Sequence, residues 1–108
     1  MNYIFNIPEE HVDRVLEEYD SHIDRLQICQ EECSELIKAI SKHIRTMKWA
    51  DDSVRAPVRE QIVEEMTHVA ICLAMLKKIF SVDQSEINDE VLKKAYTGEK
   101  YLFKCTNE

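Results

Sequence analysis

Apolar residues recur at intervals of three and four along most of the chain, which is the pattern of amphipathic α-helices. The clearest run covers residues 21–48, and its apolar positions are Ile23, Leu26, Cys29, Cys33, Leu36, Ile37, Ile40, Ile44 and Met47. Seven of these fall within about 60° of Cys33 on a helical projection, so the sequence predicts one core stripe.

A second run covers residues 57–80 and places Ile62, Met66, Val69, Leu73, Leu76 and Phe80 on one stripe. Between residues 69 and 76 this helix is apolar on almost every side. Such a helix needs more than one neighbour to cover it. The sequence therefore predicts that copies of the chain associate.

Local signals mark the ends of four helices. Pro8, followed by two acids, suits the first turn of a helix over residues 8–19. Asp20 or Ser21 can cap the second helix. These features predict a break in the chain between the first two helices.

The stretch WADDSVRAP, residues 49–57, is the clearest loop, and Pro57 opens the third helix. Asp83 with Glu86 forms a capping box for a fourth helix over residues 84–96. The opening MNYIFNI and the tail after Gly98 give no clear prediction.

The composition agrees with long helices and short connections. The chain has 108 residues with one glycine and two prolines, which leaves little material for tight turns. We expect one all-α domain over residues 1–108, an antiparallel arrangement like a four-helix bundle, and an oligomer of such domains.

The charge and the apolar runs exclude two classes of partner. A formal net charge of −7 disfavours binding to a nucleic-acid polymer, although a cation could bridge a single nucleotide to the chain. The longest apolar run, VAICLAML at 69–76, is far shorter than the roughly 20 residues that span a bilayer. We expect no membrane association and a cytoplasmic protein.

Acids stand beside the apolar stripes in two related stretches, EECSEL at 31–36 and EEMTHV at 64–69. Glu32 and Glu35 share a flank of the second helix, and Glu65 falls within the apolar stripe of the third helix with His68 at its edge. A carboxylate there is costly unless it is paired. Two antiparallel helices with these acids would gather the oxygen ligands that Mg²⁺ or Mn²⁺ prefers.

Other interpretations of the same residues stay open. Glu65 could be held in a buried salt bridge or hydrogen bond, and the acids near Glu35 could pair with lysines on an exposed helix face. A zinc site would need Cys29, Cys33 and Cys72 together with a histidine. A di-iron carboxylate bundle would need a second Glu-x-x-His motif, and the chain has only Glu65-x-x-His68.

With these motifs the chain resembles the MazG-type all-α nucleoside triphosphate pyrophosphohydrolases, over about residues 20–95. That family carries an ExxE motif on one helix and an ExxD motif on a following helix. Glu32-Cys33-Ser34-Glu35 matches the first, and Glu65-Met66-Thr67-His68 matches the second, with His68 in the usual place of aspartate. Imidazole suits Mn²⁺ better than Mg²⁺.

The resemblance implies hydrolysis of nucleoside triphosphates to monophosphate and pyrophosphate, by a homodimer or homotetramer with bound Mg²⁺ or Mn²⁺. The metal ligands that it implies are Glu32, Glu35, Glu65 and His68. Glu31 or Glu64 would orient the attacking water. Candidates for contact with the phosphates are Lys42, Arg45, Lys93 and Lys94. A member of the same family that has lost catalysis at His68, or a purely structural bundle, is the alternative.

Overall fold

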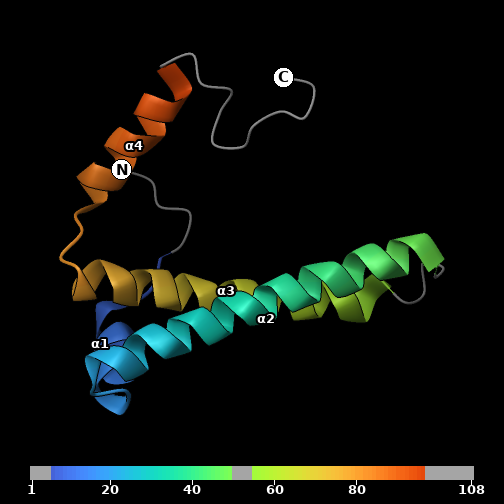
Figure 1. Ribbon diagram of the computed structural model, residues 1–108, viewed down its shortest axis with the longest axis horizontal. Coiled ribbons are helices and arrows are strands. Elements are labelled where there is room, and N and C mark those ends of the chain that lie inside the picture. The colour runs from blue at the N-terminus through green and yellow to red at the C-terminus, as the bar shows by residue number, and fades with distance from the viewer. Residues whose placement is uncertain (1–5, 50–54, 97–108) are drawn as a thin grey trace. The chain divides into compact units, whose positions relative to one another are not determined.

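The computed structural model describes residues 6–49 and 55–96 (Figure 1). In chain order the helices are α1 (Glu9–Glu18), α2 (His22–Trp49), α3 (Arg55–Ile79) and α4 (Gln84–Tyr96). No strand occurs among these residues, which confirms the predicted all-α class. Every observed end lies within two residues of the predicted one. None of the described helices combines the length and the apolar character needed to cross a bilayer.

The predicted caps of α2 and α4 are present. The backbone N–H of Asp24 donates to the hydroxyl of Ser21 at 3.0 Å, so Ser21 is the residue that caps α2. At α4 the backbone N–H of Asp83 donates to the Glu86 carboxylate at 2.8 Å, which is the reciprocal half of a capping box. Each cap satisfies a donor that the first turn of a helix leaves free.

The chain divides into two compact units, residues 1–76 and residues 77–108. The first unit holds α1, α2 and most of α3, and the second holds the end of α3 and α4. The single domain over residues 1–108 stays a prediction. Residues 1–5 of the opening segment, residues 50–54 of the expected loop and the tail after Gly98 lie outside the described residues.

Arg25 joins α1 to α2 in the first unit. Its guanidinium donates to the carbonyl oxygen of Leu16 from Nε at 3.1 Å and from Nη2 at 2.7 Å, and it also donates to the carbonyl of Tyr19. The last carbonyls of a helix have no partner within the helix, and α1 has no basic residue in its own last turn. An arginine from the next helix therefore completes the end of α1.

Helices α2 and α3 run antiparallel, side by side (Figure 1). The Cys29 thiol lies 3.7 Å from the carbonyl oxygen of Cys72, and Glu32 contacts His68, so the residue numbers of paired positions add up to about 100. The buried and half-buried residues of α2 along this contact follow a spacing of three and four, namely Cys29, Glu32, Leu36, Ala39, His43 and Thr46. That spacing is typical of two helices packed along their length.

The predicted core stripe of α2 is only partly a core. Cys29 is buried, whereas Ile37, Ile40, Ile44 and Met47 are 45–63% exposed. The side of α2 that meets α3 is rotated from that stripe and is centred on Ala39, which is 2% exposed. Alanine permits the close approach of two helices, and among residues 6–49 and 55–96 no second layer covers the isoleucines. The predicted stripe of α3 is likewise incomplete, since Met66, Leu73 and Phe80 are exposed.

The end of α3 is closed by a Schellman motif in the second unit. The backbone N–H of Val82 donates to the carbonyl of Lys77 at 2.8 Å, and that of Ser81 donates to the carbonyl of Lys78 at 3.3 Å. The motif needs a left-handed residue, and Ser81 takes it with φ of 54°. Glycine is the residue that adopts this conformation without a steric cost.

We expect Ser81→Gly to stabilise the chain by about 0.5–1 kcal/mol, because it removes the left-handed cost of a side chain. Urea unfolding followed by circular dichroism measures the change. Ser85→Gly is the matched control, since it places glycine inside the first turn of α4 and should destabilise the chain by about 0.5 kcal/mol. Equal effects of the two substitutions would contradict the role of the cap.

Candidate metal centre

Three side chains from two helices converge in the first unit. Glu32 comes from α2, and Glu65 and His68 come from α3, where a spacing of three places them on the same face. The antiparallel contact of α2 with α3 brings Glu32 opposite this face. Among the described residues this is the one group of acids, histidines and cysteines with metal-ligating atoms that all lie within 4.8 Å of one another.

One ring nitrogen lies between the two carboxylates. His68 Nδ1 is 2.9 Å from Glu32 Oε1 and 3.3 Å from Glu65 Oε1. Nδ1 is hydrogen-bonded to the Glu65 carboxylate in a direction set by the tautomer of the ring, and it forms an ion pair with Glu32 when the ring is protonated. The imidazole thus links α2 to α3 through the two glutamates.

The three side chains of the cluster differ in solvent exposure, from a nearly buried acid to an accessible imidazole. Glu65 is 9% exposed as a residue, and the exposed fractions of the side chains are 12% for Glu65, 25% for Glu32 and 40% for His68. Within the described part of the chain, no lysine or arginine lies within 4 Å of either glutamate. Two acids with one imidazole retain negative charge, and a cation can reach them from the side of His68.

The spacing of the three residues can be compared with that of ligands around a divalent metal ion. Neighbouring ligands around a cation at about 2.1 Å are separated by roughly 3.0–3.4 Å in octahedral or tetrahedral geometry. The separations of Nδ1 from the two carboxylate oxygens, 2.9 and 3.3 Å, are close to that range, and they are also those of ion pairs without a metal. Two carboxylates and one imidazole suit Mn²⁺ and other transition metals, whereas Mg²⁺ prefers oxygen ligands alone.

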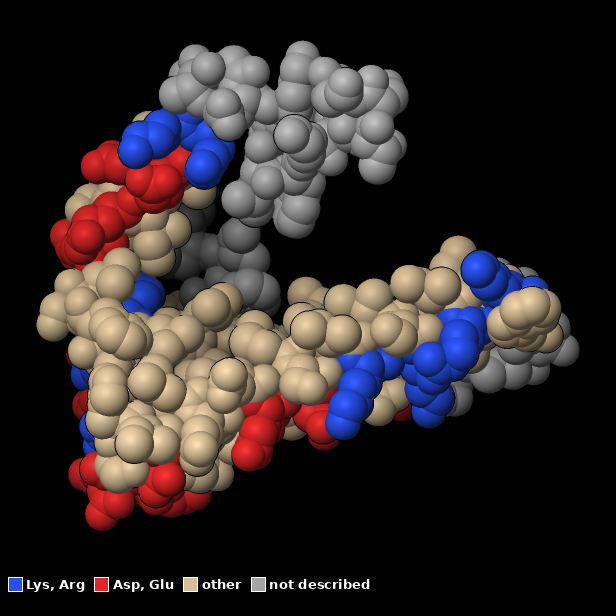
Figure 2. Space-filling view, in the orientation of Figure 1, with Lys and Arg blue, Asp and Glu red and all other residues tan. Residues whose placement is uncertain are grey.

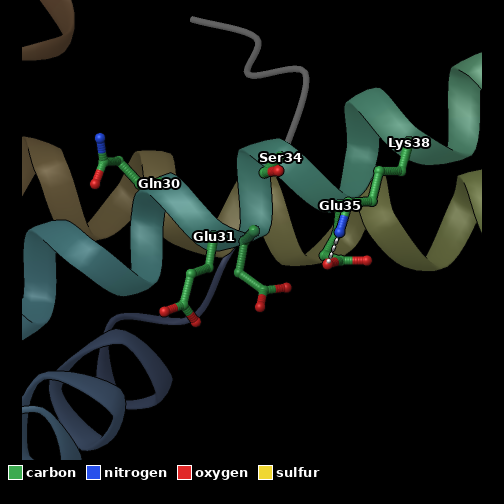
Figure 3. A pocket seen from close by; sticks show the side chains of 6 residues that line it. Gln30, Glu31, Ser34, Glu35 and Lys38 are labelled. Carbon is green, nitrogen blue, oxygen red and sulfur yellow. Dashed lines mark hydrogen bonds and ion pairs between the residues drawn. The ribbon is translucent and has the colours of Figure 1, made fainter.

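Glu35, predicted as a ligand, is not part of the cluster. It is exposed, and Lys38 Nζ donates to its carboxylate at 3.3 Å. Figure 3 shows Glu31 and Glu35 on the same side of α2, at an open hollow whose lining comes entirely from that helix: Gln30, Glu31, Glu32, Ser34, Glu35 and Lys38. The cluster member Glu32 thus adjoins an acidic surface that solvent reaches.

The other predicted site residues lie on the surface. Glu31 and Glu64, predicted to orient water, are exposed residues directly before Glu32 and Glu65 in the sequence. Lys42 and Arg45 are exposed on α2. In the second unit, Lys93 and Lys94 are exposed on α4, where Lys93 Nζ lies 3.3 Å from the Glu90 carboxylate. Their predicted contacts with phosphates remain predictions.

Three of the four cysteines lie within the described residues. Cys29 and Cys72 are buried and Cys33 is exposed, and all three are free thiols. Burial raises the pKa of the Cys29 thiol. The pKa of Cys72 is raised to about 12, mainly by burial and next by the neighbouring Cys29. Among the described residues, the cysteines do not gather with a histidine into a group of possible metal ligands, which disfavours the alternative zinc site.

The sequence singled out all three residues of the cluster, so none was missed. The sequence placed Cys72 only in the alternative zinc site, although Glu32 contributes to raising its pKa. No family model matches the chain, and no curated protein and no solved structure matches it significantly.

The raised pKa of Cys72 predicts a loss of stability in alkaline solution. The folded state keeps this thiol protonated, so its contribution is complete below the ordinary value of 9.0 and is lost as the pH rises toward about 12. We expect the free energy of unfolding in urea to fall less steeply between about pH 8 and pH 10.5 in Cys72→Ala than in the parent chain. Cys33→Ala, at the exposed thiol, should keep the parent slope. Identical slopes in all three proteins would refute the prediction.

Proposed function

We propose that the chain is a metal-dependent nucleoside triphosphate pyrophosphohydrolase of the MazG type that works as a homodimer or homotetramer in the cytoplasm. The observation that carries the proposal is the convergence of Glu32 with Glu65 and His68 from two antiparallel helices. These residues are the first acid of the ExxE motif and both motif positions of the Glu-x-x-His stretch. The resemblance in sequence therefore supports the same residues as the geometry does.

In this proposal Glu32, Glu65 and His68 hold the cation. Glu35, which lines the adjoining acidic hollow, would be a further ligand once it leaves Lys38. A divalent ion bound there would neutralise the triphosphate and lower the pKa of a water molecule. The water attacks a phosphorus atom, the bond to the pyrophosphate leaving group breaks, and the products are monophosphate and pyrophosphate. Such transfers depend mainly on positioning and on charge stabilisation, so the protein needs no nucleophile of its own.

Exposed residues of the chain are candidates for the remaining roles. Glu31 and Glu64 are candidates to accept the proton of the attacking water, because each precedes a cluster acid and is open to solvent. Lys42 and Arg45 on α2, and Lys93 and Lys94 on α4, are candidates to contact the phosphates. The acidic chain then binds an anionic substrate through the cation.

A second candidate function rests on the hydrogen bonds of His68. Because Nδ1 lies within hydrogen-bond distance of both acids, the imidazole already compensates Glu65 without a metal ion. A structural cluster that joins α2 to α3, or a metal-binding member of the family without catalysis, would use the same contacts. Measurements of metal binding and of hydrolysis separate these functions.

We expect Mn²⁺ to raise the melting temperature of the parent chain more than Mg²⁺ does, because the set of ligands includes an imidazole. A metal ion that binds only the native state raises the free energy of unfolding by about 2.7 kcal/mol when its free concentration is a hundred times its Kd. Differential scanning calorimetry measures the shift. In His68→Asp, Mg²⁺ should raise the melting temperature more, relative to Mn²⁺, than it does in the parent chain. In Glu65→Gln, the rises caused by Mn²⁺ and by Mg²⁺ should both be smaller. An absence of any shift in the parent chain would favour the structural cluster.

We expect release of pyrophosphate from some member of a panel of ribo- and deoxyribonucleoside triphosphates, measured with Mn²⁺ and with Mg²⁺ separately. Loss of a carboxylate from the cluster should lower the rate at least a hundredfold in Glu32→Gln and Glu65→Gln, since one lost electrostatic contact costs about 10²–10³ in rate. Glu60→Gln, at an exposed acid of α3 outside the cluster, should retain the parent rate. A metal-induced rise in melting temperature with no hydrolysis across the panel would identify a binding module instead.

A further inference from the structure

Two buried thiols lie opposite each other in the contact between α2 and α3. Cys29 is 4% exposed and Cys72 is 3% exposed, and both are free. The Cys29 thiol lies 3.7 Å from the carbonyl oxygen of Cys72, and beyond the rise caused by burial the charge of Cys29 raises the pKa of Cys72 further. The pair stands one helical turn from the contact of Glu32 with His68. The two thiols are therefore neighbours across the helix contact.

The packing of the two helices suits a disulfide between these positions. Disulfides join residues whose Cα atoms lie about 4.4–6.8 Å apart. Directly opposed residues of two packed helices have Cα atoms roughly 3.5–5.5 Å apart, because axes separated by about 8–10 Å carry backbones of about 2.3 Å radius. On α2 the buried Ala39 keeps the two backbones close. Closing the pair of Cys29 and Cys72 therefore needs no large movement of either helix.

A third thiol connects this pair to solvent. Cys33 is exposed and stands one turn after Cys29 on the same helix. It is close enough to both buried thiols for its charge to raise the pKa of each, in addition to the larger effect of burial. On a helical projection Cys33 is rotated by about 160° from Glu31 and Glu35, and Figure 2 shows uncharged surface extending over both helices, with acidic and basic side chains along its lower edge. An anionic reagent can therefore approach Cys33 without passing these acids.

Cys29 and Cys33 are less suited to a disulfide with each other. Side chains four positions apart on a helix have Cβ atoms about 5–6 Å apart, whereas a disulfide holds its Cβ atoms about 3.5–4.5 Å apart. A bond between these two residues would strain α2. The bond from Cys29 to Cys72 avoids that strain, so thiol–disulfide exchange favours it.

We propose that Cys29 and Cys72 form a reversible disulfide and that Cys33 is the thiol that takes up the oxidant, a small disulfide RSSR. Cys33 attacks one sulfur of RSSR, and RSH leaves with the proton that Cys33 lost. Cys29 then attacks the Cys33 sulfur and releases the second RSH. Finally Cys72 attacks the Cys29 sulfur, which returns Cys33 to a thiol. Two protein thiols are thereby oxidised, while one RSSR is reduced to two RSH.

The disulfide ties the hairpin together beside the metal cluster. Cys29 precedes Glu32 by one turn, and Cys72 follows His68 by one turn. A bond between positions 43 apart removes freedom mainly from the unfolded chain, so it stabilises this end of the hairpin. In a compartment that keeps thiols reduced, such a bond is transient and responds to the redox state.

Oxidation of the reduced full chain with glutathione disulfide tests the proposal. We expect the number of thiols that react in denaturant to fall from four to two, and digestion by glutamyl endopeptidase to yield peptides joined through Cys29 and Cys72. This protease separates Cys29 from Cys33, because Glu31 and Glu32 lie between them. The melting temperature should rise by on the order of 10 °C, and dithiothreitol should reverse the rise.

Two single substitutions test the route of the oxidation. Cys33→Ser should slow the appearance of the joined peptides by about tenfold or more, because the oxidant must then reach a buried thiol. Cys105→Ser, which also removes one thiol, should keep the parent rate. A mixed disulfide that stays on Cys33, a final disulfide other than that of Cys29 with Cys72, an unchanged rate in Cys33→Ser, a slower rate in Cys105→Ser, or a melting temperature that oxidation does not raise would each overturn the proposal. The test uses neither metal nor nucleotide, so its result is independent of the proposed hydrolysis.

Discussion

A carboxylate that is almost out of contact with water imposes the strongest constraint on the first unit. Glu65 lies in the contact between α2 and α3, where an unpaired charge would oppose their packing. Among the described residues, the basic group that contacts Glu65 is His68, one turn further along the same helix, and Glu32 from α2 lies 2.9 Å from the same nitrogen. The two helices thus meet where one imidazole nitrogen contacts both acids. The excess of negative charge at that point makes a divalent cation a natural addition.

The sequence predicted the helices and the cluster well because both depend on local spacing. Capping residues such as Ser21 fix the start of a helix within its first turn, and Glu65 with His68 occupies one face of any helix. The connection over residues 50–54 is short, so antiparallel pairing of α2 with α3 follows, and Glu32 comes to meet that face. Glu35 stands three residues after Glu32, as His68 does after Glu65, yet it is exposed and paired with Lys38, so the spacing alone did not predict its place.

The sequence did not predict which side of α2 would face α3. Residues near Ile40 form the more apolar side, yet the contact uses the side of Ala39. A helix with two adjacent apolar flanks can pack through either, and the choice depends on the shape of the partner and on the position of the polar cluster. Once Glu32 must meet His68, the rotation of α2 is set, and its isoleucines turn away from α3. Periodicity along one helix contains no information about that coupling.

The contacts of the cluster join distant parts of the chain. Cys29 and Cys72 are 43 positions apart, and the pair of Glu32 and His68 spans 68 − 32 = 36 positions. A helical hairpin gains contacts outward from its connection, because each new contact then closes only a short additional loop. The cluster lies far from the connection, so we expect it to form late during folding and to open early during partial unfolding. Amide hydrogen exchange near Glu32 should therefore follow the closing of the hairpin rather than the formation of its helices.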